Sequence, residues 1–515
     1  MENKNRVIAV IEIGSTGIRL LVAEIRGNDN WHIVDRASKP ISLGRDVFTS
    51  GKVSRESFLE CLMVLQHFRE LVRGWGVGDG DIQVIATSAI RVAKNRDMVV
   101  DRIRQEVGLD VTIVEGIEEN RLMYLAVRYA LKNDLPLFWK ANSCVIEVGG
   151  GSTEIMLLRR GKVAAAHSVR LGTILVDQQS RLAMGNQLFQ ERYIQENVRN
   201  TSESLKSEMD LNYVRSFVAV GGDARVVATH IGREFNRNSW IVDRTEFIKF
   251  YEQIQNYSPD ECARKLQMPY ADAEGFIAAI LIYKLFLEKT VASKVIVPNV
   301  SIREGVVINA ASQVDSELQE EFFSQIIASA MTLGRKFHYD EVHNRHVAKL
   351  ALDIFDALIN EHGMQRRDRV LMEVAAILHD VGMFIRGADH HKHGQYIVSN
   401  SEIFGLHGDE QAIIANIVRY HRGEPPQSTD FEYMALQREE RMQVLKMTSI
   451  LRVADALDRG HSQRIKKISL ERQADTVFIY AEGSYDMSME RLGLEEKGDL
   501  FQDVFGYTIV LSHKG

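Results

Sequence analysis

The chain has 515 residues, a mass of 58.4 kDa and a net charge of −7 at pH 7, which indicates three or four domains and no bulk attraction for nucleic acid or another polyanion. Hydrophobic residues make up 45% and charged residues 26% of it, which excludes a mostly disordered protein. The three cysteines, Cys61, Cys144 and Cys262, are too few and too widely spaced for a disulfide framework, and no apolar run approaches the ~20 residues that span a bilayer.

The N-terminal segment leads straight into an apolar run and lacks a secretory leader pattern, so we expect a cytoplasmic protein without a membrane segment. Two apolar runs, Val7 to Ile13 and Ile18 to Glu24, flank Gly-Ser-Thr-Gly as in a β-hairpin. Cys144 to Val148 and Ile155 to Leu158 flank a Gly-Gly-Gly-Ser-Thr turn in the same way. One pattern used twice, far apart, predicts two homologous lobes with a ligand cleft between them.

Strand-to-helix junctions follow at 82–91, 217–223 and 295–304, where small or hydroxyl residues begin helices that favour anions. The apolar spacing becomes helical after about residue 312, and short strand-like runs return near the C-terminus. We therefore predict four domains: two α/β lobes at 1–130 and 131–312, an all-α domain at 313–465 and a small α+β segment at 466–515.

The two glycine turns have the composition of phosphate-binding loops, because glycine exposes backbone N–H groups and neighbouring hydroxyls donate to phosphate oxygens. A single such turn also serves hairpin geometry alone, and its duplication favours the functional interpretation. Glu12 and Glu147 end the preceding strands, where a carboxylate could hold Mg²⁺ directly or through water. The candidate phosphate-binding residues are Gly14, Ser15, Thr16, Gly149, Gly150, Gly151, Ser152 and Thr153. The Gly-x4-Gly-Lys-Ser/Thr motif of P-loop enzymes does not occur.

A series of motifs in the first 312 residues resembles the exopolyphosphatase/guanosine pentaphosphate phosphohydrolase family, whose members have an actin-like (ribonuclease H-like), two-lobed α/β fold. The motifs are Ile11-Glu12-Ile13-Gly14-Ser15-Thr16, Thr87-Ser88-Ala89-Ile90-Arg91, Glu118-Glu119-Asn120-Arg121-Leu122, Glu147-Val148-Gly149-Gly150-Gly151-Ser152-Thr153-Glu154, Gly221-Gly222 and Arg303-Glu304-Gly305. The resemblance implies a cytoplasmic enzyme, a homodimer, that releases terminal phosphate from inorganic polyphosphate or guanosine pentaphosphate with Mg²⁺ in the cleft.

The same resemblance implies roles for individual residues. Glu119, rather than its neighbour Glu118, aligns with the general base for the attacking water, and Glu147 is a second catalytic and metal-binding carboxylate. Arg91 is expected to bind phosphate, as are Gly221 and Gly222 with the two loops. Glu304 stands at a capping-box spacing from Ser301, which favours a helix cap over a catalytic role.

The chain departs from the family pattern at three positions, since the family usually has aspartate in place of Glu12 and Glu147 and asparagine in place of Thr16. An added methylene moves a carboxylate by more than ~1 Å, which changes how it can position a metal ion or a water. Two interpretations stay open: a re-spaced metal site, or a cleft that binds its ligand without hydrolysing it.

Histidines cluster between residues 338 and 461, and His379-Asp380 is an adjacent pair of potential metal ligands in an apolar helix. His343, His379-Asp380 and the distant Asp455 together resemble the HD metal-dependent phosphohydrolase superfamily, which implies that these four residues bind a divalent metal such as Mn²⁺ or Mg²⁺. His346 is the alternative first ligand, and three others could complete a second metal site or contact phosphate: His391, His393 and His421. A packing domain without catalysis is the other interpretation.

Two other functions compete with the phosphohydrolase cleft. The chemistry could lie in the HD-type domain, with the lobes sensing a phosphate or nucleotide, or the protein could bind a phosphorylated signal without catalysis. Short basic clusters such as 366–369 and 464–467 read as solvated surfaces, so we expect no nucleic acid partner.

Overall fold

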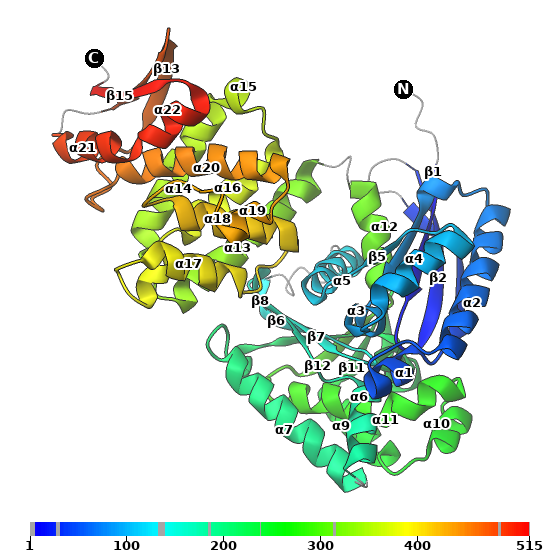
Figure 1. Cartoon of the computed structure of the whole chain (residues 1–515). Coiled ribbons are helices and arrows are strands. Elements are labelled where there is room, and N and C mark those ends of the chain that lie inside the picture. The colour runs from blue at the N-terminus through cyan, green and yellow to red at the C-terminus, as the bar shows by residue number, and fades with distance from the viewer. Residues whose placement is uncertain are drawn as a thin grey trace. The chain divides into compact units, whose positions relative to one another are not determined.

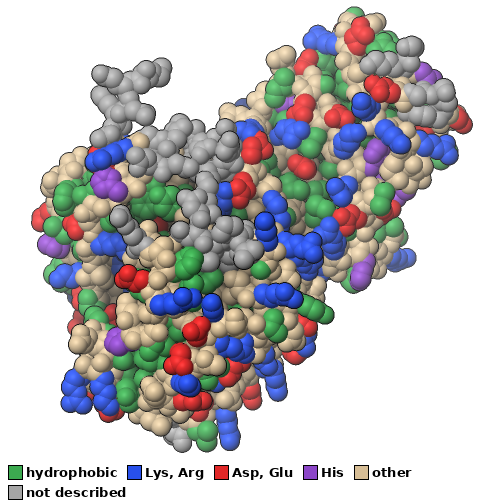
Figure 2. All heavy atoms as spheres, turned by 180° about the vertical axis from the view of Figure 1, so that it is seen from behind, with side chains coloured by type: hydrophobic (Ala, Val, Ile, Leu, Met, Phe, Trp, Pro, Cys, Tyr) green, Lys and Arg blue, Asp and Glu red, His purple; other side chains and the backbone are tan. Residues whose placement is uncertain are grey.

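The computed structural model describes residues 6–26, 31–131, 140–183, 187–236, 238–312, 316–482 and 486–513. Its contacts divide the chain into two units, Met1–Glu321 and Phe322–Gly515, which are described separately. None of the helices in these ranges has the length and apolar character needed to cross a membrane. On the face shown in Figure 2, acidic and basic side chains are interspersed.

The first lobe of the N-terminal unit is a five-stranded sheet in the order β3-β2-β1-β4-β5, covered by helices (Figure 1). β1 pairs antiparallel with β2, as the hairpin pattern predicts, and parallel with β4. The strands are β1 (Arg6–Ile13), β2 (Gly17–Ile25), β3 (Trp31–Pro40), β4 (Ile82–Ala86) and β5 (Val111–Ile113). The helices are α1 (Leu43–Ser50), α2 (Arg55–Gly74), α3 (Ser88–Val92), α4 (Arg96–Val107), α5 (Gly116–Leu131) and α12 (Ile302–Ser312), with a 3₁₀ turn η1 (Asp79–Asp81).

The first strand is apolar on both faces because both faces are covered. Ala9, Ile11 and Ile13 pack in one core with α2 and α4, whereas Ile8 and Val10 pack in another with α12. Successive side chains of a strand point to opposite faces, so a continuous apolar run is what a doubly covered sheet requires. The carboxylate of Glu12 then falls at the end of the strand, where the sheet opens to the cleft.

The second lobe is a seven-stranded sheet in the order β10-β11-β12-β9-β6-β7-β8. Its strands are β6 (Asn142–Val148), β7 (Thr153–Arg159), β8 (Lys162–Val169), β9 (Ser216–Val220), β10 (Arg233–Asn236), β11 (Ser239–Asp243) and β12 (Lys294–Pro298). Its helices are α6 (Thr173–Leu182), α7 (Gln187–Leu205), α8 (Gly222–Ile231), α9 (Arg244–Ile254), α10 (Pro259–Lys265) and α11 (Tyr270–Glu288), with a 3₁₀ turn η3 (Leu211–Tyr213).

The two lobes repeat one topology, which confirms the predicted two-lobed α/β arrangement. In each lobe three antiparallel strands are followed by two parallel ones, β3-β2-β1-β4-β5 and β8-β7-β6-β9-β12. Corresponding hydrogen bonds close the two hairpin loops, from Gly14 N to Gly17 O at 3.0 Å and from Gly149 N to Ser152 O at 2.8 Å. The repeat therefore extends to the loop geometry.

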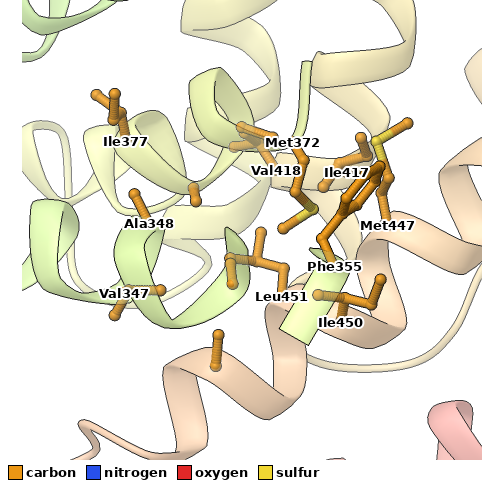
Figure 3. Packing of buried hydrophobic residues seen from close by; sticks show 14 of the residues in the cluster. Val347, Ala348, Phe355, Met372, Ile377, Ile417, Val418, Met447, Ile450 and Leu451 are labelled. Atoms are coloured by element: carbon orange, nitrogen blue, oxygen red, sulfur yellow. The ribbon is translucent and has the colours of Figure 1, made fainter. Parts of the chain in front are cut away.

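The C-terminal unit is mainly helical, as predicted, and its helices enclose one apolar core. Figure 3 shows part of that core, where Phe355 of α14 lies among Met372, Ile417 and Met447 from three other helices. The elements are α13 (Ser316–Lys336), within which the division of the chain falls, α14 (Glu341–Ala357), α15 (Ile359–His362), α16 (Arg366–Leu378), η4 (Val381–Phe384), α17 (His390–Ser399), α18 (Gly408–Tyr420), α19 (Phe431–Met434) and α20 (Arg438–Ala456).

A three-stranded sheet and two helices complete this unit. β13 (Ile468–Gln473) and β14 (Thr476–Ala481) form a hairpin, and β15 (Thr508–His513) adds parallel to β14. Two helices, α21 (Ser488–Lys497) and α22 (Asp499–Phe505), precede β15 and pack on α20. Val477, Ile479 and Leu511 belong to the same apolar core as the helices, so this α+β segment is continuous with the helical part.

Candidate active sites

A cleft of about 810 Å³ opens between the lobes of the N-terminal unit, and both glycine loops line it. The predicted residues that line it are Glu12, Gly14, Ser15, Thr16, Glu119, Glu147, Gly149, Gly150, Ser152, Gly221 and Gly222. The hydroxyl oxygens of Ser15 and Ser88 lie 2.9 Å apart and join the first loop to the start of α3. Backbone N–H groups and hydroxyls of both lobes therefore converge on one cavity, as phosphate binding requires.

Local packing and backbone conformation explain two of the glycines. A Cβ atom on Gly151 would lie 2.3 Å from the Phe48 ring, so a side chain cannot be placed there without displacing that ring. Gly221 has φ +117°, a conformation that side chains with a Cβ rarely adopt. The triple-glycine loop and the turn between β9 and α8 therefore each contain a position that favours glycine.

The buried tyrosine Tyr283 of α11 joins the ends of the two strands that carry the second-lobe loops. Its hydroxyl donates to Val220 O at 2.5 Å and accepts from Val148 N at 3.0 Å. Val148 directly precedes the triple-glycine loop and Val220 directly precedes Gly221. Tyr283 therefore sets the spacing of these two loops, a role that no local sequence signal indicates.

Glu119 lies in the first turn of α5, is 8% exposed and faces the cleft. Burial raises its pKa to about 7, although the Arg91 guanidinium donates a hydrogen bond to it and opposes the shift. Arg91 also donates to Val114 O at 2.6 Å and is absent from the cleft lining. In this structure Arg91 acts on Glu119, whereas the sequence indicated a direct phosphate contact.

The adjacent glutamate, Glu118, has a different environment. Arg121 binds it through two hydrogen bonds, each 2.6 Å long, one to each carboxylate oxygen. Such a bidentate pair occupies the carboxylate. Of the two neighbours, Glu119 is the one that lines the cleft.

Glu12 and Glu147 face the cleft from equivalent ends of β1 and β6. Burial, reinforced by the charges of Glu12 and Glu119, raises the pKa of Glu147 to about 7. Glu12 lies 3.1 Å from the Arg303 guanidinium and 3.8 Å from that of Arg19. Carboxylates that disfavour one another's charge suit a divalent cation, so the donors fit the Mg²⁺ site expected from the sequence.

The Glu154 carboxylate connects residues of both lobes through hydrogen bonds. It accepts hydrogen bonds from the hydroxyls of Ser152 and Ser168, at 2.8 and 2.7 Å, and from the side-chain amide of Asn120 at 3.0 Å. Burial raises its pKa well above the usual value. Glu154 also lines the cleft, and because Asn120 follows Glu119 and Ser152 lies in the glycine loop, its carboxylate orients residues on both sides of the cavity.

The remaining predicted residues fall outside the cleft lining. Thr153 is fully buried, and its hydroxyl donates to the Leu171 carbonyl. Glu304 accepts from Ser301 N at 2.7 Å and caps α12, as expected. The sequence assigned no role to the arginines that line the cleft, which are scattered along the chain: Arg19, Arg36, Arg45, Arg181, Arg225 and Arg303.

A second group of ionisable residues lies in the C-terminal unit and contains the four predicted metal ligands. His343 Nε2 lies 3.7 Å from Asp455 Oδ1 and 3.9 Å from Asp380 Oδ2. His379 Nε2 lies 3.9 and 3.6 Å from the same two oxygens. Both Nε2 atoms are buried and lack a hydrogen-bond partner among the described residues. Buried polar nitrogens facing carboxylates in this way fit a metal ion.

The other oxygen of Asp380 faces two further histidines. Asp380 Oδ1 lies 3.1 Å from His390 Nε2 and 3.6 Å from His421 Nε2. His421 is one of the residues suggested for a second metal site, whereas His390 takes the place that the sequence suggested for His391 or His393. Asp380 thus has one oxygen toward each histidine pair, the arrangement of a carboxylate that could bridge two metal ions.

Hydrogen bonds on the far side of each ring fix how the histidines point. The Nδ1 atoms of His379, His390 and His421 lie 2.7–2.9 Å from backbone carbonyl oxygens, which makes Nδ1 the donor. His343 Nδ1 lies 2.8 Å from Asp458 Oδ2 instead. Each Nε2 is therefore directed inward while Nδ1 has an outer partner, an orientation that would suit a metal ligand. Asp458 carries no signal that sets it apart in the sequence.

Protonation in this group reflects the same geometry. Burial would lower the pKa of His343, but Asp455 and Asp458 outweigh it and raise the pKa to about 9, whereas burial lowers the pKa of His379 to about 4. Burial opposes the charge of Asp455, yet Lys497 and His343 hold its pKa well below the usual range. The group therefore favours a cation beside its carboxylates.

Comparisons with known proteins agree with the two-lobed fold of the N-terminal unit. A model of the Ppx/GppA phosphatase family matches residues 21–314, and a model of Ppx/GppA phosphatase domain III matches residues 327–494. The chain is 23% identical to a guanosine-5'-triphosphate,3'-diphosphate pyrophosphatase of Pseudoalteromonas atlantica over 421 residues, 80% of this chain and 79% of the relative. It is 20% identical to the protein of that name from Pseudoalteromonas translucida, over 82% of both chains. The crystal structure of an exopolyphosphatase from Cytophaga hutchinsonii covers 60% of this chain and 98% of its own, with a TM-score of 0.52 and 21% identity.

Proposed function

Because this chain belongs to the Ppx/GppA phosphatase family, we propose that its cleft releases the terminal phosphate of inorganic polyphosphate or guanosine pentaphosphate by metal-assisted attack of water. The observation that carries the proposal is the buried Glu119 carboxylate, which lines the cleft and has a pKa of about 7. A general base works best when its pKa lies near the working pH. Glu119 meets that condition, and in this proposal water, not Glu119, attacks the phosphorus.

Besides a general base, phosphoryl transfer mainly requires that the protein position the phosphate and the water and neutralise the phosphate charge. The loop amides after Gly14 and Gly149 and the hydroxyl of Ser15 donate to the phosphate oxygens, whereas the Ser152 hydroxyl donates to Glu154 and steadies its loop. Arg19 and Arg303 bring positive charge to the lining. Glu12 and Glu147 would hold Mg²⁺, which supplies Lewis-acid stabilisation of the phosphoryl charge.

The test is phosphate release from polyphosphate and from guanosine pentaphosphate in the presence of Mg²⁺. We expect turnover by the unaltered protein, loss of turnover in Glu119→Gln, and retention in the matched neighbour Glu118→Gln, whose carboxylate pairs with Arg121. If the unaltered protein releases no more phosphate than Glu119→Gln, the cleft is a binding site only. The two substrates are compared in parallel because the cleft chemistry suits either.

We propose a second centre in the C-terminal unit, an HD-type metal-dependent phosphohydrolase site. The buried Nε2 atoms of His343 and His379, which have no hydrogen-bond partner among the residues that the structure describes, favour it, since such atoms cost free energy unless a cation or donor satisfies them. His343, His379, Asp380 and Asp455 would hold the first divalent ion, with His390 and His421 beside a second. When bound, such ions supply an activated water at neutral pH.

Crossed variants separate the two centres. If the cleft performs the hydrolysis, Glu119→Gln abolishes it and Asp380→Ala leaves it in place. The reverse pattern assigns the chemistry to the histidine cluster and makes the lobes a sensor. The homodimer expected from the resemblance is tested by light scattering of the full chain.

A further inference from the structure

The ammonium group of Lys497 lies against the candidate metal centre of the C-terminal unit. Lys497 Nζ donates a hydrogen bond to Asp455 Oδ2, while Oδ1 of the same carboxylate faces His343 and His379. Lys497 ends α21 and lies beyond residue 494, where the match to the domain III model stops. The lysine is therefore supplied by a C-terminal segment that the matched family range leaves out.

The segment is held firmly in this position. Arg452 of α20, 3% exposed, donates from Nε to Lys497 O at 3.2 Å and from Nη2 to Asp499 Oδ1 at 3.1 Å. Its Nη1 donates to Gly423 O at 2.7 Å. Arg459, three residues after the end of α20, forms a second ion pair with Glu496 of α21, at 2.6 Å. Lys497 is thus placed by several contacts and not by a free chain end.

The ammonium group of Lys497 has more N–H donors than it uses in contacts with the described residues. It carries three N–H groups, and Asp455 is its one hydrogen-bond partner among the described residues. The Lys497 side chain is 17% exposed and the Asp455 side chain that it contacts is 12% exposed, so the ammonium group is sheltered but reachable. A partly desolvated cation with free donors beside metal ligands suits a phosphate oxygen.

We propose that Lys497 is an anion-binding residue of this metal centre, which binds a phosphoryl oxygen of the substrate next to the metal. The inference rests on the metal centre proposed above. It has a second consequence, because a positive charge bonded to a ligand carboxylate disfavours another cation on that carboxylate. Removing Lys497 therefore weakens phosphate binding and leaves metal binding equal or tighter.

The experiment uses the full chain loaded with Co²⁺, whose visible spectrum distinguishes histidine ligation from the all-oxygen donors of the cleft. The spectrum is followed during titration with Co²⁺ and then with inorganic phosphate. Lys497→Met should raise the phosphate midpoint roughly tenfold to a hundredfold, the size of a lost hydrogen bond to a charged group, without weakening Co²⁺ binding. Lys497→Arg should keep most of the phosphate affinity, and the exposed Lys467→Met is the matched control.

Three outcomes overturn the inference. An unchanged phosphate midpoint in Lys497→Met removes the anion-binding role, and weaker Co²⁺ binding makes Lys497 an orienting residue instead. If the unaltered protein shows no histidine-ligated Co²⁺ spectrum, the metal centre itself fails and this inference with it. Circular dichroism and thermal unfolding of each variant check that the C-terminal unit is folded.

Discussion

Arg91 Nη1 donates to the Glu119 carboxylate and to the Val114 carbonyl oxygen, so one guanidinium ties the candidate base to the end of β5. Burial raises the pKa of Glu119, and the charge of Arg91 lowers it again, which leaves a pKa of about 7. The pair therefore sets the pH at which the base becomes available. Changing the arginine should move that pH without touching the substrate loops.

We expect Arg91→Met to raise the pKa of Glu119 and to shift the acidic limb of the pH–rate profile upward by roughly 1–3 pH units, the size of one neighbouring opposite charge. In the unaltered protein kcat/KM should rise as the pH increases through about 7, because the base acts when deprotonated. The measurement is kcat/KM against pH for both proteins. A uniform loss of rate with an unmoved limb would mean that Arg91 acts on the substrate instead.

The stability of the N-terminal unit should fall as the pH rises from about 4.5 to about 7. The pKa of Glu147 is raised to about 7 by burial, so between these values the folded state binds a proton that the unfolded state has released. The proton-linked stabilisation is complete below the unfolded pKa and is lost through the folded one. One such group contributes on the order of 1–3 kcal/mol.

The check is urea unfolding of metal-free protein at pH 5 and pH 8. Glu147→Gln should reduce the difference between the two pH values, whereas Asp97→Asn, at a side chain that is 94% exposed, should leave it unchanged. An equal pH dependence in Glu147→Gln would assign the effect to other groups, of which Asp223, also with a pKa raised to about 7 by burial, is the next to change.

Short sequence motifs were enough to predict the two similar lobes. The hairpins around Gly14 and Gly149 are encoded by apolar runs and turn residues within a few positions of each other, and the structure closes both with corresponding hydrogen bonds. The positions of the strand-end carboxylates Glu12 and Glu147 follow from strand periodicity. The predicted fold therefore rested on interactions that are close in the sequence.

The residues that were missed act across long sequence distances. His390 and His391 are adjacent in the sequence, and the orientation of α17 determines that His390 is the one whose side chain faces Asp380. Tyr283 reaches strands 63 and 135 residues away, and Lys497 lies 42 residues from Asp455. The residues next to them in the sequence give no sign of these roles, because their partners are brought close only by tertiary packing.

Removing the hydroxyl of Tyr283 should separate the two loops that it spaces. Tyr283→Phe leaves Val148 N and Val220 O buried without this partner, which costs about 1–3 kcal/mol of unfolding free energy. We expect kcat/KM in the cleft to fall as the loops lose their spacing. The matched control is Tyr251→Phe in the same lobe core. Equal activity of the two variants would limit Tyr283 to stability.

The strongest test of the histidine centre is its outer partner Asp458. Asp458 lies 2.8 Å from His343 Nδ1 and is itself held by Gln463, so it fixes the ring that presents Nε2 to the metal position. Asp458→Asn should weaken binding of Co²⁺ or Mn²⁺ by roughly tenfold to a hundredfold, the usual cost of losing an outer carboxylate. This direction is opposite to that expected for Lys497→Met, because Asp458 supports a ligand whereas Lys497 adds a competing positive charge. Calorimetric titration of both variants distinguishes them, and weakening of the same size in both would show that the site responds only to general disruption of its packing.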